Sequence, residues 1–164
     1  MMTPVDWAKR PIEKYATFTG RASRPEYWWY TLALIVAYVV ISVVENMVGL
    51  SQMAGPYGLL SLLLMLATLV PSLAVSVRRL HDTNRSGWWL LIALVPYCLM
   101  AIAGVMALSG GGPLTLMAMV GVISIIALIG AVVLLVFMVL PGTPGDNSYG
   151  SPPASNGDGV VAAE

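Results

Sequence analysis

The sequence predicts an all-α integral membrane protein, a bundle of four membrane-spanning helices with the N and C termini in the cytoplasm. Of its 164 residues, 58% are hydrophobic and 10% are charged, whereas soluble domains carry about 25% charged residues. The apolar residues form four long runs without charge, not the alternating segments of about ten residues that build a β-barrel. All eight basic residues lie outside these runs, in two segments on one predicted side of the membrane.

The N-terminal arm, residues 1–26, holds five basic residues and no apolar core, so we expect no cleaved signal peptide. The first span then serves as the insertion signal. A short interfacial helix is expected over residues 6–17, although Pro11 interrupts it. There, apolar side chains stand among basic ones, as they do in surface helices: Trp7, Ile12 and Tyr15.

Four uncharged runs are long enough to cross a hydrocarbon core of about 30 Å as helices. These four spans make up the membrane domain, 27–140, and we place them at residues 27–44, 59–77, 88–108 and 114–140. The fourth run exceeds a straight crossing, so we expect it to tilt or to extend past the interface. Pro71 and Pro96 each remove one backbone donor within a span, which predicts a kink. The alternative interpretation is a hinge, or an opened carbonyl that binds an ion.

The positions of the basic residues predict the orientation. They occupy only the arm and the loop between the second and third spans, 78–87. Because positively charged loops stay in the cytoplasm, the arm, this loop and the C-terminal tail, 141–164, are predicted to be cytoplasmic. The tail is rich in Pro, Gly, Ser and Asn, and we expect its end to be disordered.

Three polar motifs flank the spans on this side: FTGRASRPEYWW at 18–29, RRLHDTNRSGWW at 78–89 and PGTPGDNSYG at 141–150. In the first motif, Ser23 is placed to cap a helix and Glu26 follows three residues later, as in a capping box. In the third, the Pro and Gly spacing demands tight turns. We expect the three motifs to converge into one polar cap, in which Arg21, Asp82 and Asn147 share contacts.

Within this cap we single out the residues whose chemistry suits either ligand binding or internal pairing. They are Gly20, Arg21, Ser23, Arg24, Glu26, Trp28, Arg78, Arg79, His81, Asp82, Arg85, Gly87, Trp88, Asp146 and Asn147.

Taken together, the three motifs resemble the bacterial inner-membrane family catalogued as domain of unknown function 805, which includes the YhaH-like proteins. That family shows a GRxSRxE(F/Y)W block before its first span, RRLHDxxRSGWW between its second and third, and PGxxGxNxYG after its last. All three blocks stand here in the same order, over residues 18–150. The resemblance implies a location in the inner membrane. It implies no activity, because none is established for the family as a whole.

Two interpretations of the cap arginines remain open. The guanidinium fork suits an anionic lipid headgroup or another phosphate, which Trp28 and Trp88 would flank. Alternatively, the arginines set the topology and pair with the acidic residues Glu26, Asp82 and Asp146.

The leading hypothesis is therefore a structural or accessory membrane protein whose cap binds anionic lipid headgroups or a protein partner. A small oligomeric channel or transporter is the alternative, although no ionisable residue lies within a predicted span. A third is an enzyme acting on a lipid phosphate through His81 and Asp82, but without a nucleophile or metal cluster we expect no catalysis.

For partners, we expect the lipid bilayer, with a second copy or another membrane protein left open. The zero net charge argues against a nucleic-acid partner. We expect no cofactor and no metal site, and we interpret the single cysteine, Cys98, as a packing residue.

Overall fold

The computed structural model describes residues 2–50, 58–110 and 112–153, and within them every regular element except one isolated bridge is helical. In chain order the helices are α1 (Pro4–Glu13), α2 (Arg24–Val48), α3 (Leu59–Asp82), the 3-10 helix η1 (Gly87–Leu90), α4 (Leu91–Leu108) and α5 (Pro113–Val139). The four helices α2, α3, η1 with α4, and α5 are long and apolar enough to cross a membrane. The end of the tail, which we expect to be disordered, lies outside the described residues.

The arm helix α1 begins and ends earlier than the sequence predicts. Thr3 and Asp6 form a capping box: the Asp6 N–H donates to the Thr3 hydroxyl at 3.2 Å, and the Thr3 N–H donates to the Asp6 carboxylate at 2.8 Å. This box sets the start of the helix. Trp7 and Pro11 are the buried residues of α1, which packs against α2 and α3, so the expected interruption at Pro11 is accommodated in a helix.

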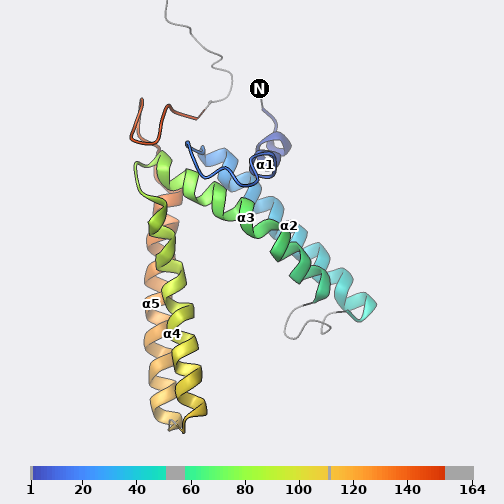
Figure 1. The fold of residues 1–164 in the computed structure, drawn as a ribbon. Coiled ribbons are helices and arrows are strands. Elements are labelled where there is room, and N and C mark those ends of the chain that lie inside the picture. The colour runs from blue at the N-terminus through green and yellow to red at the C-terminus, as the bar shows by residue number, and fades with distance from the viewer. Residues whose placement is uncertain (1, 51–57, 111, 154–164) are drawn as a thin grey trace, which may run out of the picture.

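The membrane helices form two hairpins, α2 with α3 and α4 with α5, which diverge from a shared end (Figure 1). The sequence predicts a single four-helix bundle, and the structure differs in this respect. The apolar faces of the two hairpins gain little by closing on each other, because lipid tails are as apolar as a neighbouring helix. In the part of the chain that the structure describes, polar contacts at the cap join the two hairpins.

Pro71 leaves the Ala67 carbonyl of α3 without its helical hydrogen bond, and the Tyr15 hydroxyl of the arm donates to this carbonyl instead. A helix normally supplies the Ala67 carbonyl with a donor four residues later, and proline has none to give. The Tyr15 hydroxyl donates to this oxygen at 2.8 Å. The opened carbonyl therefore anchors the arm to α3, rather than offering a ligand for an ion.

Pro96 creates a similar opening in α4, beside the close approach of α5. Gly130 lies against the Ile92 carbonyl, such that a Cβ on Gly130 would stand 3.4 Å from that oxygen. A glycine at this position lets the two helices of the second hairpin pack closely.

Glu45 holds together the far end of the first hairpin. The structure continues α2 beyond the predicted end of its span, which places the buried Glu45 inside the helix. Its carboxylate accepts the N–H groups of Leu60 at 2.5 Å and Ser61 at 3.0 Å, and the Ser61 hydroxyl at 2.6 Å. These donors belong to the first turn of α3, where free N–H groups and the helix dipole favour an anion. A side chain on Gly58 would overlap this carboxylate.

Candidate functional site

The cap joins three segments that are far apart in the sequence. At its centre, the Asp82 carboxylate at the end of α3 receives two guanidinium groups. Arg21 Nε donates to Oδ1 at 2.9 Å, and Arg79 Nη1 donates to Oδ2. All three side chains are buried. Both carboxylate oxygens accept charge-assisted hydrogen bonds. Since Arg21 belongs to the arm and Asp82 to α3, this ion pair links the arm to α3.

Arginines also complete the C-terminal end of α5. The last carbonyls of a helix lack donors within the helix. Arg79 Nε donates to the Met138 carbonyl at 3.1 Å and its Nη2 donates to the Leu140 carbonyl, while Arg24 Nε donates to Leu140 at 3.1 Å. Cationic donors suit this position because the helix dipole is negative there. Arg79 therefore ties the second hairpin to the first.

The third motif wraps around Arg21. Arg21 Nη2 donates to the Thr143 carbonyl at 2.6 Å, and Nη1 donates to the Gly145 carbonyl at 2.7 Å. The Thr143 N–H donates in turn to the Asp82 carbonyl at 2.8 Å. Gly142 is required at this turn, because a Cβ there would overlap the Asp82 carboxylate. The segment after α5 is thus fitted around the central ion pairs.

His81 is held by the same segment. Its ring stacks on Tyr149 with centroids 3.8 Å apart, and its Nδ1 lies 3.1 Å from the Gly20 carbonyl. Asn147 Nδ2 donates to the His81 carbonyl at 2.9 Å. Among the described residues, no hydrogen bond joins His81 to Asp82. The two neighbours therefore face different partners and do not form the acid–base pair considered from the sequence.

A second buried ion pair links α2 with α3. Arg78 Nη1 donates to Glu26 Oε1 at 2.5 Å, with both side chains 1% exposed. Ser23 caps α2 as predicted, accepting the Glu26 N–H at 3.3 Å. The capping box is only half formed, because the Glu26 carboxylate turns to Arg78. Within the part of the chain that the structure describes, Nε and Nη2 of Arg78 have no hydrogen-bond partner.

Arg85 lies at the margin of this network. Its guanidinium lies 4.2 Å from the centre of the Phe137 ring and donates to the Thr83 carbonyl at 3.2 Å. Trp89 meets the same ring edge-on, with centroids 5.1 Å apart. Arg85 therefore rests on α5 while remaining half-buried.

Four of the candidate residues lie outside the contacts described so far. Trp28 and Trp88 are exposed, and so is Asp146, which forms no ion pair within the described ranges. The pairing of an arginine with Asp146 that the sequence suggested is therefore not seen. Gly87 allows η1 to approach α3, because a Cβ there would lie 2.9 Å from a methyl carbon of Val77.

Sequence reasoning overlooked three contributors, Gly142, Thr143 and Tyr149. Each lies in the third motif, whose turn-forming spacing is the sequence feature that pointed to this segment. The particular roles follow only from the contacts described above, since they depend on where Arg21, His81 and Asp82 lie.

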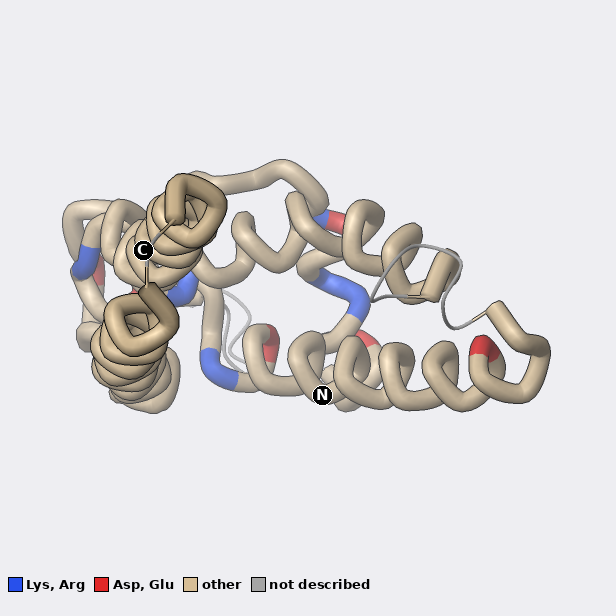
Figure 2. The backbone as a smooth tube through the Cα atoms, turned by 90° about the horizontal axis from the view of Figure 1, so that it is seen from below, with Lys and Arg blue, Asp and Glu red and all other residues tan. Residues whose placement is uncertain are grey.

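The basic residues fall into two groups. Arg21, Arg78 and Arg79 are buried and pair with Glu26 and Asp82. The remaining five are exposed or half-buried, and we call them the outer basic set: Lys9, Arg10, Lys14, Arg24 and Arg85. Neither α4 nor α5 contains a charged residue, and Figure 2 shows the charged positions on the other helices and the segments that connect them. The outer basic set comprises the cations that an external anion can reach.

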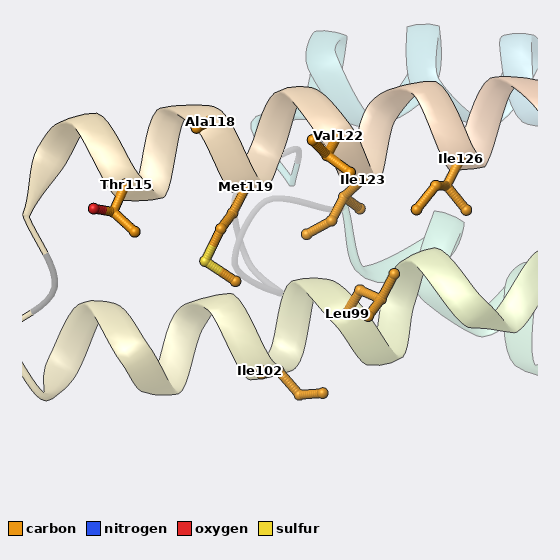
Figure 3. Close-up of a pocket in the computed structure, with 8 residues that line it drawn as sticks. All are labelled: Leu99, Ile102, Thr115, Ala118, Met119, Val122, Ile123 and Ile126. Atoms are coloured by element: carbon orange, nitrogen blue, oxygen red, sulfur yellow. The ribbon is translucent and has the colours of Figure 1, made fainter.

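The second hairpin carries an apolar groove of about 410 Å³ between α4 and α5, lined by side chains that include Leu99, Met119 and Ile126. Figure 3 shows these side chains along the two helices, with Thr115 as the polar member of the lining. Such a surface suits lipid tails and offers no charged group for an ion or a polar substrate.

Comparisons with known proteins find inner-membrane proteins among the relatives of this chain. The family model described as "Protein of unknown function (DUF805)" matches residues 15–151. "Inner membrane protein YhaI" of Escherichia coli K12 is 36% identical over 149 residues, which are 91% of this chain and 96% of that protein. "Inner membrane protein YhaH" of the same strain is 40% identical over 93 residues, 57% of this chain and 76% of that protein. No solved structure matches the chain.

Proposed function

This chain belongs to the DUF805 family, whose members include inner-membrane proteins, and we propose that it is a non-catalytic accessory protein. Its cap lies in the cytoplasm and binds anionic lipid headgroups. The observation that carries the proposal is the division of its basic residues. The buried arginines are engaged by the fold, and the outer basic set is left facing the surroundings.

The cytoplasmic orientation is supported by the positive-inside rule. All eight basic residues lie in two stretches, the arm with the first residue of α2, and the end of α3 with the segment that follows it, at the end where the hairpins meet. The anionic lipids of the cytoplasmic leaflet attract such a surface, by about 1 kcal/mol for each basic residue close to it. Exposed acidic residues offset part of this attraction: Asp6, Glu13 and Asp146.

A non-catalytic role is supported by the surroundings of the two residues considered for acid–base chemistry. Asp82 accepts from two buried arginines, and His81 is stacked on Tyr149. A general base needs hydrogen-bond reach to the proton that it removes, and the Asp82 carboxylate and His81 Nδ1 are already engaged within the cap.

The test is to identify the lipids that the purified full-length protein retains, by native mass spectrometry after extraction in a mild detergent. We expect phosphatidylglycerol and cardiolipin to be enriched over phosphatidylethanolamine, relative to the membrane of origin. Retention in the same proportions as in that membrane would refute headgroup binding. Co-purification of a stoichiometric protein in place of lipid would instead favour a protein partner.

A further inference from the structure

A second apolar groove, of about 470 Å³, runs between α1 and α2 near the cap. On α1 its walls include Val5 and Ile12, and on α2 they include Leu32 and Val36. Within each helix these positions fall on one stripe, since residues three, four and seven apart share a face. All four side chains are about half exposed or more.

The exposure of Val5 and Ile12 follows from how the arm is fixed. The opposite side of α1 is anchored by the buried Trp7 and Pro11, and Tyr15 ties the following segment to the Ala67 carbonyl. α1 therefore cannot roll to bury its second apolar stripe. Between that stripe and α2, an apolar surface remains open at the end of the span that carries Trp29, an aromatic residue of the kind that lies at membrane interfaces.

One charged residue lines this groove. Lys9 lies on the same stripe of α1 as Val5 and Ile12, and it is exposed. It forms no ion pair within the part of the chain that the structure describes. The nearby Asp6 carboxylate accepts the N–H and the hydroxyl of Thr3 on one oxygen, and the Arg10 guanidinium lies 5.3 Å from the Trp7 ring centre. An apolar groove with the Lys9 ammonium in its lining is complementary to a lipid that carries a negative headgroup.

We propose that this groove binds one acyl chain of an anionic glycerophospholipid, whose phosphate pairs with the Lys9 ammonium. The inference rests on the proposed function, and it names the lipid class and the place. A lipid with no amine in its headgroup, such as phosphatidylglycerol, fits better than a zwitterionic one, because an ammonium group on the lipid would repel Lys9. Trp29 would lie beside the bound chain.

Trp29 provides the readout. The full-length protein is reconstituted into phosphatidylcholine vesicles that contain a small fraction of phosphatidylglycerol brominated on its acyl chains. In parallel vesicles, the same fraction of phosphatidylcholine carries the bromines. Bromine quenches tryptophan on contact, and the difference between the wild type and Trp29→Phe isolates the Trp29 fluorescence. We expect stronger quenching by the brominated phosphatidylglycerol.

Two matched variants locate the binding site. Lys9→Gln should reduce the preference for phosphatidylglycerol about fivefold, the factor expected for one basic residue at an anionic headgroup. Lys14→Gln removes the same charge from the arm but lies outside the groove lining, so it should reduce the preference clearly less than Lys9→Gln does. Equal helical circular dichroism of both variants shows that the fold is kept.

Equal quenching by the two brominated lipids in the wild type would overturn the groove proposal. So would equal losses in Lys9→Gln and Lys14→Gln, which would point to diffuse surface charge. Either result leaves the proposed function standing if native mass spectrometry still finds anionic lipid enriched. Failure of that enrichment would overturn the proposed function itself.

Discussion

Arg21 Nε lies 2.9 Å from Asp82 Oδ1, in a buried ion pair between the arm and the end of α3. The two residues are separated by 61 positions in the sequence. Because Asp82 also pairs with Arg79, and Arg79 holds the end of α5, this carboxylate joins the arm to both helical hairpins. The contacts between the three segments of the cap therefore centre on this carboxylate.

Asp82→Asn should destabilise the protein strongly. The substitution keeps the shape of the side chain and leaves Arg21 and Arg79 buried without their counter-charge. Removing one partner of a buried ion pair costs about 3–5 kcal/mol, which lowers the midpoint of thermal unfolding by about 10 °C in a chain of this size. The matched control is Asp146→Asn, the same change at an exposed position of the cap, with an expected effect within about 0.5 kcal/mol. Equal midpoints for the two variants would show that the ion pairs do not hold the cap.

Gly142→Ala tests the close fit of the third motif. Its new methyl group would overlap the Asp82 carboxylate, so either Asp82 or the turn must shift. Overpacking of this kind costs about 1–3 kcal/mol. Gly121→Ala is the control, because a Cβ at that helical position meets nothing within 4 Å, and alanine is the better helix former. The midpoint of thermal unfolding should fall in Gly142→Ala and rise in Gly121→Ala, relative to the wild type. A midpoint of Gly142→Ala at or above that of the wild type would contradict the close fit around Asp82.

Tyr15→Phe should loosen the arm without unfolding the membrane helices. The substitution removes the donor to the Ala67 carbonyl that Pro71 leaves open, at a cost of about 1 kcal/mol. Trypsin cleavage after Lys14 should then become about fivefold faster, since cleavage follows the population of the open arm. Tyr97→Phe in α4 changes an exposed tyrosine and serves as the control. Unchanged cleavage in Tyr15→Phe would argue that other contacts anchor the arm.

The proposed orientation is tested by cysteine labelling in a Cys98→Ala background. A cysteine at Thr19, in the first motif, should be protected from a membrane-impermeant maleimide added to intact spheroplasts. A cysteine at Gly112, just before α5, should react. Permeabilised spheroplasts, in which both positions should react, control for access. The reverse pattern would place the cap outside the cytoplasm.

The membrane helices and the meeting of the three motifs were predictable from the sequence, for physical reasons. Long uncharged apolar runs identify the membrane spans. The positive-inside rule then places the three motifs on the same side of the membrane, where they can come into contact. The burial of Arg21, Arg78 and Arg79 was not predictable, because their charges read the same as those of Lys9 or Arg85. The sequence suggested that arginines of the cap pair with Glu26 and Asp82, and both carboxylates form such pairs. Which arginines are buried depends on how the segments pack.

The contacts of Tyr15 and Glu45 escaped prediction for a related reason. Each satisfies backbone groups of α3 from another segment, at a place that depends on how the helices pack. The separation of the membrane helices into two hairpins was also not predictable. Apolar composition shows that a helix lies in lipid but does not show which helices pack together.

The most direct test of the division between buried and outer basic residues is the lipid retained by two proteins measured side by side. Native mass spectrometry is applied to the wild type and to a variant with Lys9→Gln, Arg10→Gln and Lys14→Gln, which leaves every buried ion pair in place. We expect the wild type to retain phosphatidylglycerol or cardiolipin above their share of the membrane. The variant, which keeps only Arg24 and Arg85 of the outer basic set, should retain much less of them, with an unchanged unfolding midpoint. Identical lipid retention by the two proteins would contradict this expectation.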